Sequence, residues 1–160
     1  MKTVPAFLAV CLMVAPVSAS NDPPLNPGER AKGASKVIVA TVTDVDMAFG
    51  ENAFGDRLIL SQVTLQVEET MKGAHEASVV VTIEGGSVGD VTLDVSDMPK
   101  MEKGKRAVLF LTSAPGGRYL PSGRGAGVAE IDANDRVVGG NLSIDDIRSA
   151  VKAEQGKGKQ

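Results

Sequence analysis

Apolar and polar residues alternate along much of the chain, the pattern of strands that bury one face and expose the other. Four segments alternate in this way or are rich in β-branched residues: 36–46, 57–73, 77–84 and 90–96. The last of them places Val91, Leu93 and Val95 on a face that we expect to be buried. The segment 47–56 carries two Phe-Gly pairs and predicts a loop or hairpin connection between the first two strands.

The most apolar run beyond residue 19 spans 106–113 and shows no polar alternation. We therefore expect a central strand that is covered on both faces. Shorter strands are predicted within 116–123 and 127–140, the second as a hairpin that turns at 132–135. Because turn signals recur at short, even intervals between these strands, the pattern predicts a mainly β domain, either a barrel or a sandwich.

Helices are predicted only near the two ends of the chain. Asn26 is a candidate N-cap, and Pro27 would be the first residue of a short helix over 27–34. Ser143 and Asp146 match the capping-box pattern at the start of a C-terminal helix with one apolar face. We expect that helix to end at a glycine, residue 156, and the remaining tail to be disordered.

The first 19 residues have the anatomy of a secretory signal peptide. Lys2 precedes an apolar run, and small residues before Ser20 predict cleavage between Ala19 and Ser20. A membrane anchor is the rival interpretation, but two prolines interrupt the run, which is shorter than the ~20 residues that span a bilayer. A lipoprotein signal would use Cys11, but the residue before it is bulky. We therefore expect a periplasmic or secreted protein whose processed chain has no transmembrane anchor.

The chain beyond residue 19 contains no cysteine, so an apolar core must stabilise it without disulfides. This absence excludes thiol nucleophiles and cysteine-ligated metals. Without Lys2, the 17 basic residues become 16 against 20 acidic residues, a formal net charge of −4. The few aromatic residues are Phe49, Phe54, Phe110 and Tyr119. With no basic stripe and no base-stacking platform, the sequence does not predict nucleic-acid binding.

The sequence GGSVG at 85–89 satisfies the G-x-S-x-G pattern of the nucleophile elbow in α/β-hydrolases. That elbow requires a helix after the serine, whereas 90–96 alternates as a strand. The same fold orders its triad as serine, acid and histidine, but His75, the single histidine, precedes Ser87. We therefore interpret the glycines as turn residues that accept a positive φ. The expected turn glycines are Gly85, Gly86, Gly89 and Gly104.

Carboxylates gather near the end of the first predicted strand and in the loop after it: Asp44, Asp46, Glu51 and Asp56. Calcium favours oxygen-rich loops, but the fixed spacing of a calcium loop is missing, and a solvated face explains the cluster as well. His75 has no second ligand at a zinc-site spacing. The sequence therefore predicts no catalytic, cofactor-binding or metal-ligating residue and no cofactor.

Three motifs follow one another: GG-x-x-G at 85–89, V-S-x-x-P at 95–99 and G-x-x-x-V-L-F-L at 104–111. Their order resembles bacterial secreted proteins with a netrin-like domain, the domain of tissue inhibitors of metalloproteinases. The resemblance covers residues 30–140, with Ala40 where the family usually has glycine. It implies an OB-like Greek-key barrel of five or more antiparallel strands. The family inhibits through an N-terminal cysteine, and the chain beyond residue 19 has no cysteine, so the resemblance does not imply the inhibitor function.

The expected division of the chain is a signal peptide (1–19), a lead-in with a short helix (20–34), an OB-like barrel (35–140), a C-terminal helix (141–155) and a tail (156–160). The leading hypothesis is a non-catalytic binding module for an unknown protein or envelope ligand, because glycine-rich loops at strand ends could form a recognition rim. One alternative is an envelope hydrolase that uses Ser87 or the loop carboxylates. Another is a self-associating structural protein of the envelope.

Overall fold

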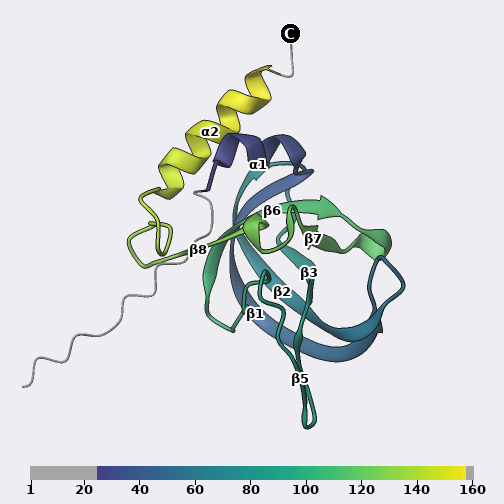
Figure 1. Ribbon diagram of the computed structural model, residues 1–160. Coiled ribbons are helices and arrows are strands. Elements are labelled where there is room, and N and C mark those ends of the chain that lie inside the picture. The colour runs from purple at the N-terminus through teal and green to yellow at the C-terminus, as the bar shows by residue number, and fades with distance from the viewer. Residues whose placement is uncertain (1–24, 158–160) are drawn as a thin grey trace, which may run out of the picture.

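The computed structural model describes residues 25–157 (Figure 1). Its elements are α1 (Pro27–Gly33), β1 (Lys36–Glu51), β2 (Arg57–Lys72), β3 (Ser78–Glu84), β4 (Gly86–Val88), β5 (Val91–Leu93), β6 (Arg106–Ser113), η1 (Pro115–Gly117), β7 (Tyr119–Pro121), η2 (Arg124–Gly127), β8 (Val128–Ile131) and α2 (Ile144–Lys157). The predicted signal peptide, its cleavage between Ala19 and Ser20, the alternative use of Cys11 and the tail after Lys157 lie outside the described residues. None of the helices within 25–157 is long and apolar enough to cross a membrane.

Five strands pair in a ring and close a barrel, in the order β1, β2, β3, β7, β6 and back to β1. An antiparallel ring cannot close with an odd number of strands, so one pair must be parallel. That pair is β3 and β7, joined at Val81 and Tyr119, and it departs from the antiparallel prediction. β8 lies beside β6, and β4 and β5 form a separate ribbon. The protein is mainly β, with an OB-like barrel and a C-terminal helix, as predicted.

The side chains of β6 alternate between two apolar layers. Leu109 and Leu111 lie in the barrel interior, whereas Val108 and Phe110 pack on the outside with residues of α1 and α2. All four are fully buried, which confirms the prediction of a strand covered on both faces. Figure 1 shows the two helices side by side at one end of the molecule, and the β4–β5 ribbon projects at the opposite end.

Both helices begin at the caps that the sequence indicates. The Oδ1 atom of Asn26 accepts a hydrogen bond of 3.3 Å from the backbone N–H of Glu29. The backbone N–H of Ser143 donates to the Asp146 carboxylate at 2.8 Å, and the N–H of Asp146 donates back to the Ser143 hydroxyl at 3.2 Å. The prediction that Gly156 ends the second helix is wrong by one residue, because α2 continues to Lys157. Gly156 does not adopt the positive φ of a glycine that terminates a helix.

The connection predicted over 47–56 is shorter than expected, because residues 47–51 continue β1 and pair with residues 57–61 of β2. Only residues 52–56 form the turn. The side-chain oxygen of Asn52 organises it by accepting the backbone N–H groups of Phe54 and Asp56, each at 2.9 Å. Of the two glycines in this segment, Gly55 has a positive φ of +88° and supplies the left-handed turn residue.

The prediction of a half-buried strand over 90–96 is wrong in its extent, and its predicted burial is found only in part. β5 covers Val91–Leu93, and the Val91 side chain is 53% exposed. β5 pairs only with β4, so the two strands form a ribbon that projects from the barrel without a second layer to cover it (Figure 1). Leu93 and Val95 are half-buried and the polar residues beside them are exposed, so the predicted alternation of burial holds at these two positions but not at Val91.

Candidate functional site

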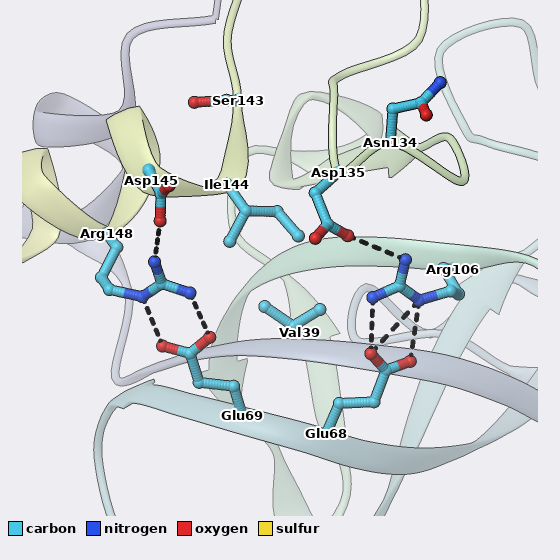
Figure 2. A pocket seen from close by; sticks show the side chains of 10 residues that line it. All are labelled: Val39, Glu68, Glu69, Arg106, Asn134, Asp135, Ser143, Ile144, Asp145 and Arg148. Atoms are coloured by element: carbon cyan, nitrogen blue, oxygen red, sulfur yellow. Dashed lines mark hydrogen bonds and ion pairs between the residues drawn. The ribbon is translucent and has the colours of Figure 1, made fainter.

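A charged cleft of about 400 Å³ lies between the barrel wall and the C-terminal helix (Figure 2). Its charged residues are Glu68 and Glu69 from β2, Arg106 from β6, Asp135 from the loop after β8, and Asp145 and Arg148 from α2. The apolar side chains of Val39 and Ile144 lie between the two arginines (Figure 2). We refer to this set of residues as the charged cleft.

A bulge in β2 brings Glu68 and Glu69 to the same side of the strand. Val39 of β1 pairs with Glu69, but the next residue, Ala40, pairs with Val67, so Glu68 has no partner of its own in β1. The extra residue lets two consecutive side chains face the same way, whereas regular alternation would send them to opposite faces. Sequence reasoning missed this cleft, because its only local signal is the pair of adjacent glutamates.

Arg106 joins three elements on one side of the cleft. Its guanidinium donates to both carboxylate oxygens of Glu68, with the shortest bond 2.7 Å long, and its third nitrogen donates to Asp135 at 3.0 Å. The hydrogen bonds from Arg106 hold the pKa of Glu68 below its usual range. Glu68 therefore stays ionised at neutral pH and is a poor proton acceptor.

Arg148 forms the same arrangement on the other side of the cleft. Two of its nitrogens donate to the two oxygens of Glu69 at 2.8 Å each, and the third contacts Asp145. Hydrogen bonding from Arg148 also holds the pKa of Glu69 below its usual range. Every guanidinium nitrogen in the cleft is thus paired with a carboxylate of the protein itself (Figure 2). The charged cleft ties α2 and the 132–143 loop to the barrel and leaves no unpaired cation for a ligand.

Ser87 and His75 lie beyond opposite ends of β3. His75 precedes the strand, with its Nδ1 atom 3.3 Å from the Thr70 hydroxyl, and Ser87 follows it, with its hydroxyl 2.9 Å from that of Thr92. β3 contains 7 residues. At about 3.3 Å per residue, a strand of this length separates the two side chains by roughly 20 Å. His75 therefore cannot act as the general base for Ser87.

The loop carboxylates are spread along the β1–β2 hairpin. Asp44 and Asp46 alternate along β1, Glu51 is its last residue, and Asp56 accepts a hydrogen bond of 3.3 Å from the Asn52 side chain. Nowhere in residues 25–157 do three or more histidine or carboxylate side chains gather in a way that could hold a metal ion. These carboxylates instead give the hairpin a negative charge.

The four turn glycines all have a positive φ: Gly85 (+110°), Gly86 (+125°), Gly89 (+58°) and Gly104 (+87°). Gly89 follows β4 in the ribbon turn, whereas Gly85 joins β3 to β4 and Gly86 is the first residue of β4. A Cβ atom on Gly86 would lie 2.8 Å from both the Met47 sulfur and the Ser61 hydroxyl. Glycine at this position therefore lets β4 cross close to β1, where the Ser87 N–H donates to the Met47 sulfur at 3.2 Å.

A second surface feature lies at the end of the barrel away from the helices. We call it the distal end and define it as the β1–β2 hairpin over 43–60 together with the β4–β5 ribbon. Among the described residues, five large apolar side chains are exposed, and four of them lie here: Met47 (41%), Phe49 (51%), Phe54 (82%) and Val91 (53%). Met47 also lines a pocket of about 230 Å³ at the mouth of the barrel. The sequence signal for this surface was the pair of Phe-Gly dipeptides.

Comparison with known proteins assigns no family, because no protein-family model and no curated protein matches this chain.

Proposed function

We propose that this protein is a secreted or periplasmic binding module that holds a polypeptide partner at its distal end and does not act as a catalyst. The observation that carries this proposal is the exposure of Met47, Phe49 and Phe54 on one hairpin. Contiguous exposed apolar side chains mark interaction surfaces, since their burial is favourable by about 25 cal/mol per Å². The five-stranded barrel also supports the resemblance to netrin-like domains, which stays a prediction.

The charge of the hairpin indicates which kind of polypeptide it would hold. Residues 44–57 contain four carboxylates and one guanidinium, that of Arg57. Asp44 and Asp46 are exposed, and no ion pair joins either of them to another described residue. Complementary charge steers association and sets specificity. We therefore expect a partner segment that combines apolar side chains with lysine or arginine.

Fluorescence anisotropy with synthetic peptides tests the proposal. The first peptide alternates lysine and valine, the second alternates glutamate and valine, and each carries a dye because the protein has no tryptophan. We expect the lysine peptide to bind at least about tenfold more tightly, which corresponds to about 1.4 kcal/mol. Equal affinity for the two peptides, or no binding of the lysine peptide, would contradict the proposal.

A matched pair of variants locates the site. Phe49→Ser removes an exposed apolar side chain from the distal end, whereas Val138→Ser removes one of similar exposure, 56% against 51%, from the loop before α2. We expect Phe49→Ser to weaken binding of the lysine peptide by about tenfold and Val138→Ser to leave it unchanged. Equal effects of the two substitutions would place binding elsewhere.

A further inference from the structure

Along the outer half of β1, no described strand is hydrogen-bonded to the edge that faces away from β2. β1 pairs with β2 throughout, but with β6 only over residues 36–41. Val42 still has backbone partners on that side, since its N–H donates to the Lys105 carbonyl at 2.9 Å and its carbonyl accepts from Gly104 at 2.8 Å. Within residues 25–157, no strand pairs with residues 43–51 on this side. We call residues 43–51 the β1 edge.

The register of the hairpin determines which backbone groups point outward from this edge. Asn52 donates its N–H to the Asp56 carbonyl at 3.0 Å, so these two residues form a hydrogen-bonded pair at the turn. Hydrogen-bonded and non-hydrogen-bonded pairs alternate along an antiparallel ladder. Every second residue from Glu51 backwards therefore turns its N–H and C=O away from β2. These residues are Val45, Met47, Phe49 and Glu51.

Apolar and charged side chains of the β1 edge lie on opposite faces of the sheet. Val45 packs against the barrel core, so Met47 and Phe49, two and four residues later, continue the same inner face. Asp44 and Asp46 lie on the outer face. A strand added to the edge would place alternate side chains beside an apolar row on one face and beside two carboxylates on the other.

We propose that the partner binds by adding an extended strand to the β1 edge, with apolar side chains on the inner face and lysine or arginine on the outer face. This inference rests on the proposed function and specifies how the polypeptide partner binds. Main-chain hydrogen bonds to Val45, Met47 and Phe49 supply affinity, and the alternating side chains supply specificity. The edge is accessible, since Met47 and Phe49 are 41% and 51% exposed.

The two aspartates favour a cationic segment over a second copy of this chain. Pairing two β1 edges would bring Asp44 and Asp46 of both copies onto one small strand pair, where like charges repel. Charged side chains are a common device that prevents an exposed edge from pairing with itself. A cationic strand meets the same carboxylates with opposite charge. Sedimentation at the concentrations of the binding assay should therefore show a monomer. A dimer that is lost on Phe49→Pro, which removes an N–H that faces away from β2, would assign the edge to a second copy and overturn the proposal.

Backbone methylation of the peptide tests the mode of binding directly. N-methylation removes a donor from the peptide backbone, and only every second N–H of an added strand faces β1. Two versions of the lysine–valine peptide carry methyl groups on all lysine amides or on all valine amides. We expect one version to lose at least about tenfold in affinity and the other to bind much as the parent does. If both bind like the parent, strand addition is excluded, although the proposed function stands.

Amide hydrogen exchange supplies the protein side of the test. The N–H groups of Met47 and Phe49 face solvent in the free protein, so they should exchange rapidly. Saturation with the lysine–valine peptide should slow their exchange at least about tenfold, while the N–H of Ala48, already bonded to β2, serves as the internal control. Unchanged exchange at Met47 and Phe49 in the saturated complex would overturn the proposal. Absence of any binding would overturn both this inference and the proposed function.

Discussion

The pair Arg148–Glu69 holds α2 against β2, and its contribution to stability should depend on pH. The pKa of Glu69 is lower in the folded protein than its ordinary value of 4.5, because Arg148 donates two hydrogen bonds to it. A carboxyl group whose pKa is lower in the folded protein than in the unfolded chain stabilises the fold at pH values above its unfolded pKa. This contribution is lost as the pH falls through the folded pKa. We expect Glu69→Gln to cost roughly 0.5–1 kcal/mol at neutral pH, since the pair is partly exposed and screened.

Urea denaturation of the native protein and the variant at neutral and acidic pH checks this expectation. Glu69→Gln should weaken the acid dependence of the free energy of unfolding below pH 4.5, the ordinary pKa of the group. Asp145→Asn is the matched control, because Asp145 is 85% exposed and contacts the same guanidinium. It should change the acid dependence less. An unchanged acid dependence in Glu69→Gln would show that the pair does not stabilise the fold.

The N-terminus of α2 should be sensitive to the loss of its cap. The Ser143 hydroxyl accepts the N–H of Asp146 at 3.2 Å, and removing an N-cap side chain typically costs about 1 kcal/mol. We therefore expect Ser143→Ala to lower the free energy of unfolding by about that amount in thermal or urea denaturation. Ser149→Ala, an exposed position inside the same helix, is the control and should be neutral or slightly stabilising. Equal effects at the two serines would show that the cap does not stabilise α2.

Local patterns predicted the elements better than they predicted the pairing between them. The N-cap at Ser143 and the two-sided burial of β6 follow from neighbouring residues, so the sequence was sufficient for both. The bulge at Glu68 and the continuation of β1 through Phe49 depend on how β1 and β2 align, and alternation within one strand does not encode that alignment. Both surfaces considered for function, the charged cleft and the distal end, rest on these features, which is why neither was predicted.

The barrel closes where β7 meets β3, and a small polar cluster lies beside that closure. Lys36 is only 3% exposed, and its ammonium lies 2.7 Å from the Glu76 carboxylate. The Tyr119 hydroxyl donates to the same carboxylate at 2.6 Å, and the Lys36 ammonium lies 5.4 Å from the centre of the Tyr119 ring. The cluster therefore joins the start of β1, the segment before β3 and the start of β7. It connects the strands whose pairing is the shortest in the ring, a single residue pair.

The hydroxyl of Tyr119 reports on this closure, because hydrogen bonding to Glu76 raises the pKa of Tyr119 to about 12 from its ordinary value of 10.0. A raised folded pKa means that the contribution to stability is complete below pH 10.0 and is lost as the pH rises toward about 12. Tyr119 is the single tyrosine and the chain has no tryptophan, so ultraviolet absorbance follows its ionisation alone. We expect Glu76→Gln to move the titration midpoint toward 10.0, whereas Glu130→Gln, which removes a carboxylate paired with Lys105, should leave it in place. If the midpoint in the unaltered protein is already near 10.0, the Tyr119–Glu76 bond does not hold the barrel closed.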